Sequence, residues 1–350
     1  MAASLDEVAA RAGVSASTVS RALRDVPGVA LRTRERVKAA AAEVGYVSNV
    51  SGSRLATGKT GTIAIVVPTA ARWFFGQAIA GAGAVIRGAG LDVLLYELGD
   101  AAGRQRLFAE HGLRGRADAV LVLSLNLSGS ETRLLQQLGV PVAVLGVGPA
   151  SFSSVVVNDQ LAAESALRHL INLGHEVIGL IGIDNGSDVT SGSVPPIARV
   201  AGYRAAVSSA GMSLDPDLEQ LDENSAAGGA AAMTRLISGP VMPTAVFASS
   251  DEMAFGALHV LRSAGIRVPA DMSIVGFDNH DFAAVVDLTT VDQNVLAQGQ
   301  AAARLVLAAL ANPGAAPTTA SVPTRLVIRR STAPPQPLRR RLEATDTTQN

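Results

Sequence analysis

The chain has 350 residues, a length that predicts two or three folded units at about 150 residues each. Its 48% apolar and 17% charged residues exclude a disordered protein or a coiled coil, and the absence of cysteine excludes disulfides and cysteine-ligated metals. The net charge of −1 hides an asymmetry, because residues 1–60 carry +4 and the remainder carries −5. A basic head on an acidic body suggests contact with a polyanion at one end.

Neither a secretory signal nor a membrane span is visible in the sequence. The start, MAASLDEVAARAG, has acids at Asp6 and Glu7 and no apolar core. The longest uncharged run, residues 134–158, is interrupted by glutamines and prolines, which are unsuited to one membrane helix. We therefore expect a cytoplasmic protein.

Two short helices are predicted near the start of the chain. Ser4 followed by Glu7 matches the capping box that begins a helix at the next residue, and Gly13 is expected to end that helix. Ser15 is expected to cap a second helix over residues 16–24. In this second helix the apolar side chains share one face, whereas the opposite face carries small hydroxyl groups and arginines.

A third helix is expected to have Thr33 as its cap and to end at Val44, which completes a unit of three helices. A tight turn between the first two helices is typical of a helix-turn-helix, whose second helix enters the major groove of DNA. Arg21 lies on the polar face of that helix, and arginine donating to guanine is the commonest specific base contact. The alternative is a small bundle with a solvated polar face. We favour DNA binding.

The segment 47–60, VSNVSGSRLATGKT, separates the helical head from the first expected strand. It contains Gly52, Gly58 and Lys59, which suggest a phosphate-binding loop. That motif requires four residues between its glycines and a strand before them, and neither condition is met. The segment is therefore interpreted as a linker.

From residue 61 onward, apolar runs alternate with helical segments. The expected strands are TIAIVVP, LDVLLYEL, DAVLVLSL, PVAVLGV, SVVVN, VIGLIGI, TAVFASS and MSIVGFD, followed by LTTVDQ and RLVIRR. Continuous β-branched runs between helices indicate parallel sheets covered on both faces. This many strands favours two α/β lobes over one sheet.

The sequence contains no motif of a known enzyme class. There is no G-x-S-x-G motif and no G-x-G-x-x-G motif after a strand. The pair His175-Glu176 is followed by Gly179 where a zinc-protease motif needs histidine, and the five histidines lie far apart. We expect no catalytic residues, no metal and no cofactor, although only motif-bearing enzymes are excluded.

A collinear series of short motifs runs through the chain. In the head and linker it comprises LDEVAARAGVSASTVSRAL, Thr33-Arg34, Gly45-Tyr46, Asn49 and Leu55-Ala56-Thr57-Gly58. In the body it includes His169-Leu170, Gly174-His175, Gly202-Tyr203, Asp251, Pro269, Gly276-Phe277-Asp278 and Leu288-Thr289-Thr290-Val291. Over about residues 4–330 this series resembles the lactose/galactose repressor family of transcription regulators.

The resemblance implies an α/β protein with an N-terminal three-helix helix-turn-helix domain and a two-lobed effector domain with parallel sheets, of the periplasmic-binding-protein type I. The expected boundaries are 1–46 for the DNA-binding domain, 47–60 for a hinge, and 61–330 for the effector and dimerisation domain, with lobes 61–158 plus 293–320 and 159–287 plus 322–330. The tail 331–350 is rich in proline and then polar, so we expect it to be disordered. It lacks leucine heptads and should not build a tetramer.

The resemblance also implies contacts between the head and operator DNA. The candidate residues are Ser15, Ala16, Ser17, Thr18, Ser20, Arg21, Arg24, Thr33, Arg34, Tyr46, Asn49, Gly52 and Leu55. Residues 49–57 would form a hinge helix on the operator, with Leu55 as a wedge in the minor groove, unless Leu55 is an ordinary buried leucine. Gly52 disfavours a helix by about 1 kcal/mol relative to alanine, so the hinge is expected to be mostly unfolded without DNA.

Polar residues at the ends of expected strands are candidate effector contacts. The set comprises Asp159, Arg199, Ser250, Asp251, Asp278 and Gln293, together with the aromatic residues Trp73 and Phe74. Acids and an arginine that converge on a cleft suit a hydroxyl-rich ligand, because each can hold two hydroxyl groups. Arg199 and Asp278 match the effector contacts of the family, whereas Asp251 has the alternative of capping its helix.

Three positions depart from the family pattern. Arg72-Trp73 stands where Asn-Pro is common, and the alternative for Trp73 is packing between lobes or at a dimer contact. Asn224 stands near the place of an aromatic platform in some sugar-binding members, and Ser250 replaces a usual asparagine. The identity of the effector is therefore left open.

The sequence as a whole predicts a transcription regulator that binds specific DNA sequences on the nucleoid in the cytoplasm. We favour a repressor over an activator. A small-molecule effector, expected to be of sugar type, would bind between the lobes, and a homodimer would bind a pseudo-palindromic operator. One alternative is a solute-binding protein of a transport system, which the basic head and the missing signal disfavour. The other is a doubly wound enzyme acting on a sugar or nucleotide.

Overall fold

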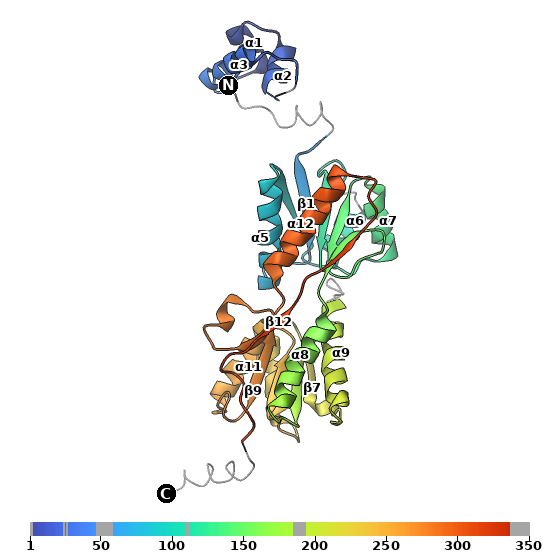
Figure 1. Ribbon diagram of the computed structural model, residues 1–350, viewed down its shortest axis with the longest axis vertical. Coiled ribbons are helices and arrows are strands. Elements are labelled where there is room, and N and C mark those ends of the chain that lie inside the picture. The colour runs from blue at the N-terminus through green and yellow to red at the C-terminus, as the bar shows by residue number, and fades with distance from the viewer. Residues whose placement is uncertain are drawn as a thin grey trace. The chain divides into compact units, whose positions relative to one another are not determined.

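The computed structural model describes residues 3–23, 25, 27–46, 59–109, 112–184 and 194–336. Contacts within the chain divide it into two compact units, Met1–Gly61 and Thr62–Asn350 (Figure 1). None of the helices in the described residues has both the length and the apolar character needed to cross a membrane. The two units are described in turn.

The first unit contains a bundle of short helices. They are α1 (Leu5–Ala12), α2 (Ala16–Leu23) and α3 (Leu31–Glu43). Ser4 and Glu7 form the predicted capping box, and Gly13 ends α1 in a left-handed conformation with φ 64°. Ser15 precedes α2, and its Oγ accepts the N–H of Thr18 at 3.2 Å, as expected of a cap. The core is small and aliphatic, and consists of Val8, Ala9, Ala12, Val19, Ala22, Val37, Ala40 and Ala41.

The start of the third helix differs from the prediction. The helix begins at Leu31, because the carbonyl of Ala30 already accepts the N–H of Arg34 at 3.0 Å. Thr33 therefore lies within the first turn, and its assignment as the cap is wrong. Ala30 occupies the cap position without a side-chain hydrogen bond.

The second unit contains two six-stranded sheets in its described residues. The first has the order β11-β5-β4-β3-β1-β2 and the second β12-β10-β9-β8-β6-β7. The strands of the first sheet are β1 (Thr62–Val67), β2 (Asp92–Glu97), β3 (Ala119–Leu123), β4 (Val142–Leu145), β5 (Ser153–Val156) and β11 (Thr319–Ser321). Those of the second are β6 (Ile178–Ile183), β7 (Glu219–Asp222), β8 (Ala245–Ala248), β9 (Ser273–Phe277), β10 (Thr289–Asp292) and β12 (Arg325–Val327). Neighbouring strands in both sheets pair in parallel, except β10 and β12, which are antiparallel.

Helices cover both faces of each sheet and make two lobes (Figure 1). The first lobe has the first sheet with α5 (Trp73–Gly88), α6 (Ala101–Ala109), α7 (Gly129–Gln137) and α12 (Val295–Ala311). The second lobe has the second sheet with α8 (Asp159–Asn172), α9 (Val194–Ser209), α10 (Ala226–Ser238), α11 (Asp251–Ser263) and the short helices η1 (Pro216–Leu218) and η2 (Asp281–Ala283).

Strand β1, TIAIVV, is apolar from Ile63 to Val67, and its packing shows why. Ile63, Ile65 and Val67 pack into the core beneath α5 and α12, whereas Ala64 and Val66 pack into the core beneath α6 and α7. A strand that is buried on both faces cannot alternate apolar with polar residues. This confirms the predicted parallel α/β architecture.

The chain crosses between the lobes at three places. It passes from β5 to α8, from β10 to α12 and from β11 to β12. Strands β7 and β11 were not predicted, because their sequences, EQLD and TAS, are short and polar. The ordered chain also continues past the predicted start of the tail, since the carbonyl of Ser331 accepts the N–H of Ile274 at 2.8 Å. Residues 337–350 of the predicted tail lie outside the described residues.

Candidate effector cavity and nucleic-acid interface

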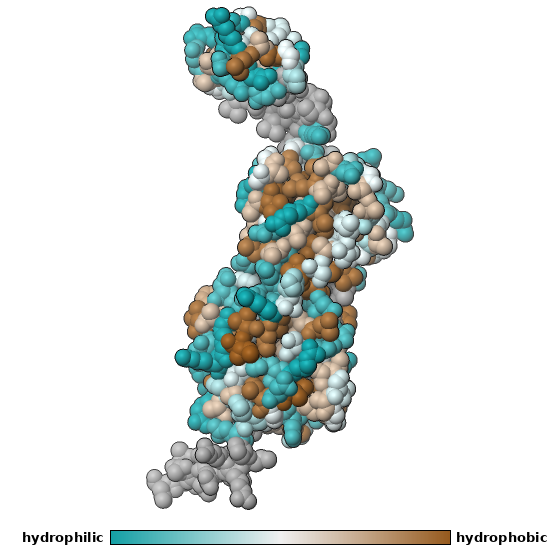
Figure 2. All heavy atoms as spheres, in the orientation of Figure 1, coloured by the Kyte–Doolittle hydropathy of each residue, from teal (hydrophilic) through white to brown (hydrophobic). Residues whose placement is uncertain are grey.

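The predicted recognition helix α2 presents its hydroxyl groups away from the core. Ser15 Oγ lies 2.9 Å from both Ser17 Oγ and Thr18 Oγ1, so these side chains form one linked cluster at the start of the helix. Arg21 is exposed, and its Nη2 donates to the carbonyl of Pro27 at 3.0 Å. Hydrophilic residues cover much of the visible surface of this unit (Figure 2).

Other residues of the predicted DNA interface have different environments. Ala16 and Tyr46 pack against the edge of the small core and are half-buried. Thr33, Ser20 and Arg34 are half-buried too, and Arg34 Nε lies 3.3 Å from Asp25 Oδ1. The remaining candidates lie outside the described residues; they are Arg24, Asn49, Gly52 and Leu55.

A cavity of about 1090 Å³ lies in the second unit, with lining residues from both lobes. Many of these residues come directly after strands: Pro68, Ser124, Gly146, Val157, Asp184, Glu223, Asp278 and Gln293. The carboxyl ends of parallel strands are where open α/β sheets bind ligands. The position of the cavity thus follows from the topology of both sheets.

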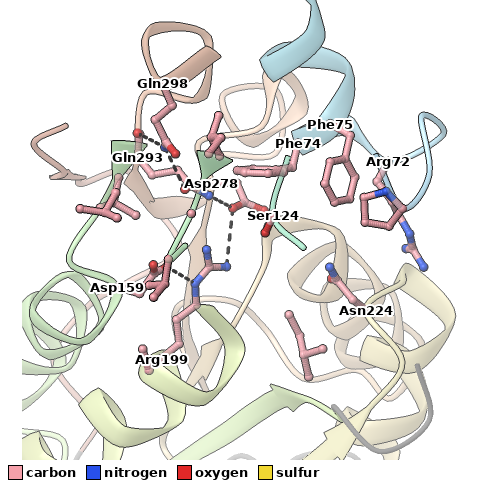
Figure 3. A pocket seen from close by; sticks show the side chains of 18 of the residues that line it. Arg72, Phe74, Phe75, Ser124, Asp159, Arg199, Asn224, Asp278, Gln293 and Gln298 are labelled. Carbon is pink, nitrogen blue, oxygen red and sulfur yellow. Dashed lines mark hydrogen bonds and ion pairs between the residues drawn. The ribbon is translucent and has the colours of Figure 1, made fainter. Parts of the chain in front are cut away.

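The two walls of the cavity differ in chemistry (Figure 3). The first lobe contributes the rings of Phe74 and Phe75, which meet edge to face with centroids 5.2 Å apart. It also contributes the aliphatic side chains Leu145, Val155 and Val157. The second lobe contributes most of the charged side chains, including Asp159, Arg199, Asp222, Glu223, Arg235 and Asp278.

Arg199 is the centre of the charged wall. Its Nε donates to Asp159 Oδ1 at 2.8 Å, its Nη1 donates to the carbonyl of Ser249 at 2.7 Å, and Nη1 lies 3.8 Å from Asp278 Oδ1 (Figure 3). The guanidinium carbon lies 3.7 Å from the centroid of the Phe277 ring. The side chain is only 7% exposed, so its charge depends on these partners.

Two glutamines continue this network toward the first lobe (Figure 3). Gln293 Nε2 donates to Asp278 Oδ1 at 2.5 Å, and Gln298 Nε2 donates to the carbonyl of Gln293 at 2.6 Å. Because Gln298 is on α12, the network joins the second sheet to a helix of the first lobe. These hydrogen bonds hold the polar side chains in position.

Asp278 and Asp251 are buried acids with unusual electrostatics. Burial raises the pKa of Asp278 above the ordinary carboxyl value, although the charge of Arg199 opposes this effect. Burial likewise raises the pKa of Asp251, against hydrogen bonds from the Thr290 hydroxyl at 2.6 Å and from the His280 N–H at 2.8 Å. The negative charge of Asp251 raises the pKa of Asp278 further.

The backbone beside Asp278 is also unusual. Asp278 has φ 130° and Asn279 has φ 56°, conformations that side-chain-bearing residues rarely adopt. Arg329 holds the turn, since its Nη2 donates to Asn279 Oδ1 at 2.8 Å. Strained backbone that is held by surrounding contacts is a common feature of binding sites.

The cavity brings together most, but not all, of the predicted effector residues. Phe74, Asp159, Arg199, Asp278 and Gln293 line it. The lining does not include Trp73, Ser250 or Asp251. In this arrangement, Ser250 caps α11 by accepting the N–H of Met253 at 3.3 Å and donates to Asn224 Oδ1 at 2.7 Å. Asp251 is therefore the first residue of the helix and not its cap.

Sequence reasoning missed several lining residues. They include Ser124, Asp184, Asp222, Glu223, Arg235 and Gln298. Asp184 follows a predicted strand and Ser124 is the last residue but one of another, so the rule used for Asp278 applied to them as well. Asp222 ends the unpredicted β7 and Glu223 follows it, whereas Gln298 lies inside a helix, where no strand-end signal exists. Among the described residues, no group of His, Asp and Glu side chains is arranged to hold a metal ion.

Two family models match the chain. Residues 4–49 match the bacterial regulatory proteins of the lacI family, and residues 167–332 match the periplasmic binding protein-like domain. The chain is 33% identical over 344 residues to the HTH-type transcriptional regulator CelR of Thermobifida fusca, covering 93% of this chain and 97% of that protein. The chain belongs to the LacI family of bacterial regulatory proteins.

Further members of the LacI family match this chain over nearly its whole length. The HTH-type transcriptional repressor CytR of Escherichia coli (strain K12) is 31% identical over 338 residues, covering 95% of this chain and 96% of CytR. A crystal structure of the lac repressor dimer, bound to operator and the anti-inducer ONPF, superimposes with a TM-score of 0.83 at 25% identity, covering 95% of this chain and 100% of that one. This LacI-family protein is therefore a DNA-binding transcriptional regulator, and the relatives named here are regulators and not enzymes.

Proposed function

We propose that this regulator binds a neutral, hydroxyl-rich molecule of sugar type in its cavity, and that the bound molecule controls binding of the head to operator DNA. The observation that carries the proposal is the fixed network of Arg199, Asp159, Asp278 and Gln293 opposite two phenylalanine rings. Carboxylates, guanidinium and amide groups suit hydroxyl groups, and the rings suit the apolar face of a sugar. CelR, a relative of this chain, has been solved as a complex with cellobiose.

The charges of the cavity favour a neutral ligand over an anionic one. Arg235 already donates to Asp222 Oδ2 at 2.9 Å and to Gln220 Oε1 at 2.7 Å. Arg72 Nη2 donates to Glu223 Oε1 at 2.9 Å, and Arg199 is held between acids. A phosphate or carboxylate would have to displace one of these carboxylates. A neutral polyol can accept from the arginines and donate to the acids without breaking the pairs.

The head supplies the DNA contacts in this proposal. Its exposed polar helix α2 would read base edges in the major groove, with Arg21 as the specifying residue beside Ser17. A homodimer would place two such helices on a pseudo-palindromic operator, as in the lac repressor dimer bound to operator. The protein would act as a repressor on the nucleoid in the cytoplasm.

A paired measurement on the full chain tests both halves of the proposal. Gel-shift titrations at two salt concentrations should show duplex binding with a steep salt dependence, because arginine contacts with phosphates release counterions. Thermal unfolding should then be measured with cellobiose and other neutral sugars and nucleosides, each next to its phosphorylated or acid counterpart.

The gel-shift and thermal-unfolding measurements test separate claims, so one can fail without the other. A neutral compound should raise the melting temperature and change duplex affinity, and its charged counterpart should do neither. Stabilisation by the anionic members alone would overturn the neutral-ligand proposal. Failure to bind any duplex at low salt would overturn the DNA-binding half.

A further inference from the structure

The amino end of α5 in the first lobe contacts several acids of the second lobe. Arg72 Nη1 donates to Glu252 Oε2 at 2.9 Å, and its Nη2 donates to Glu223 Oε1 at 2.9 Å. The Arg72 side chain is 28% exposed and that of Glu252 is 23% exposed, so this pair is less screened than a surface ion pair. One arginine thus reaches two separate elements of the opposite lobe.

Trp73, the only tryptophan of the chain, adds contacts of a different kind. Its Nε1 donates to Asp281 Oδ2 at 3.0 Å, and its ring centroid lies 4.9 Å from that of His280. The His280 ring in turn meets Phe255 at 5.2 Å, within the second lobe. The backbone N–H of Trp73 lies 3.4 Å from Glu252 Oε1, so an acid of the second lobe occupies the amino end of a first-lobe helix.

We propose that Arg72 and Trp73 form an interlobe clasp with Glu223, Glu252, His280 and Asp281, and that the clasp sets the resting closure of the two lobes. Its members come from one end of α5 on one side and from three segments on the other. A rotation of either lobe therefore breaks the ion pairs and the indole hydrogen bond together. Such an all-or-none contact favours one closed arrangement over a continuum of partly open ones.

The clasp adjoins the cavity, because Arg72 and Glu223 also line it, and a short, strained turn connects the clasp to Asp278 as well. Asp278 lines the cavity, and Asp281, three residues later, accepts from Trp73. Between them the N–H of His280 donates to the buried Asp251, and Arg329 holds Asn279. Because the turn is held at Asn279 and at His280, we expect that a movement of Asp278 also moves Asp281 and the clasp. This last step rests on the proposed effector site, whereas the clasp itself does not.

Distance measurements between the lobes test the clasp directly. Since the chain has no cysteine, the exposed Gln136 on α7 and Ser209 on α9 can be replaced by cysteine and spin-labelled without background. Electron double resonance on labelled full-length chain, diluted into unlabelled chain, then gives the distribution of interlobe distances. The measurement needs neither operator nor effector.

Two clasp variants and one matched control decide the outcome. Arg72→Met and Trp73→Phe should each shift the ratio of separated to closed lobes at least about threefold, as expected for contacts with measurable coupling. Arg204→Met removes an arginine that pairs with Glu219 at 2.6 Å inside the second lobe, and it should leave the distribution unchanged. Wild-type distributions in both clasp variants would overturn the proposal.

A double variant separates a clasp from a general loss of packing. Once Arg72→Met is present, adding Glu252→Gln should change the distance distribution less than Glu252→Gln does in the wild-type background, because both substitutions remove the same ion pair. Fully additive shifts would contradict the clasp. Because these readouts are taken without effector, their failure leaves the proposed effector site standing, and absence of sugar binding leaves the clasp standing.

Discussion

The recognition helix of the head and the charged wall of the cavity use similar side chains in opposite environments. In α2, Arg21 and Ser17 are exposed and contribute little to the small aliphatic core beside them. In the cavity, Arg199, Asp159 and Asp278 are nearly inaccessible to solvent and are held by one another. A buried charge that loses its partner costs far more than an exposed one.

This difference indicates how function and stability are distributed in the molecule. In the head, polar side chains can change specificity without affecting folding. In the cavity, the same kind of change alters ligand binding and the free energy of unfolding together. The predictions below test that contrast, from the largest expected effect to the smallest.

Arg199→Ala should have the largest effect on folding. Removing the guanidinium leaves Asp159 and Asp278 buried without their cation, which is expected to lower the free energy of unfolding by about 3–5 kcal/mol. The variant should also lose its response to effector. Urea unfolding measures the first effect, with Arg204→Ala as a control because Arg204 is exposed. Equal unfolding midpoints for the two variants would contradict the buried-network account.

Arg21→Ala should weaken specific operator binding without affecting folding. Loss of a base contact is expected to cost about 1–3 kcal/mol of specific affinity and to relax preference at one base pair per half-site. The unfolding midpoint should stay close to that of wild type, since Arg21 is exposed. Binding to operator and to random duplex can be compared with Arg11→Ala, an exposed arginine on α1. Equal losses on both duplexes would make Arg21 a phosphate contact.

The buried acids should make stability depend on pH in an unusual direction. Because their pKa values are raised on folding, the folded chain holds protons that the unfolded chain releases above about pH 4. These two acids should therefore make the free energy of unfolding fall as pH rises from about 4 toward the raised pKa values, by up to about 1.4 kcal/mol per pH unit for each retained proton. Burial lowers the pKa values of His169, His175 and His280, which contributes in the opposite direction.

The Asp251→Asn variant isolates one of these contributions. Asparagine stays neutral, so the decline of stability with pH should become shallower than in wild type. The exposed Asp92→Asn serves as the control, and its pH profile should follow that of wild type. Urea unfolding at several pH values between 4 and 8 provides the measurement. A decline as steep in Asp251→Asn as in wild type would exclude this acid as the cause.

Gly52→Ala should have the smallest effect, and its sign is informative. Gly52 lies outside the described residues, so the expectation comes from the sequence alone. Alanine favours a helix, which should tighten operator binding by up to about 1 kcal/mol per subunit and make release by effector less complete. Gel-shift titration measures the change. Weaker binding would indicate that the glycine is needed for close backbone approach.

Local signals in the sequence predicted the fold well where they were strong. The capping box of α1 and the apolar strands buried on both faces appear as expected. Strand β7 was missed because EQLD pairs with only one neighbour and carries polar residues at the edge of a sheet. Edge strands have no need for the continuous apolar pattern that identifies central ones.

The site was predictable only to the level of chain position. Asp159, Asp278 and Gln293 were predicted because parallel strands end at a common edge, whereas Arg199 was predicted from its place three residues before Gly202-Tyr203 and its match to the effector contacts of the family. Trp73 and Phe74 show the limit, since adjacent residues of a helix point about 100° apart. Phe74 faces the cavity, whereas Trp73 reaches the acid of η2. Which of the two faces the ligand depends on how α5 is rotated, and no local pattern specifies that rotation.

The last strands in the sequence, β11 and β12, each complete one of the two sheets, which has a consequence for synthesis on the ribosome. β11 completes the first sheet beside β5, and β12 completes the second beside β10. Residues near Ser331 then bond to β9. The head contains its own core within the first 46 residues and can fold as soon as these leave the exit tunnel. Translation that stops before residue 319 would thus release a folded head without a finished lobe to control it.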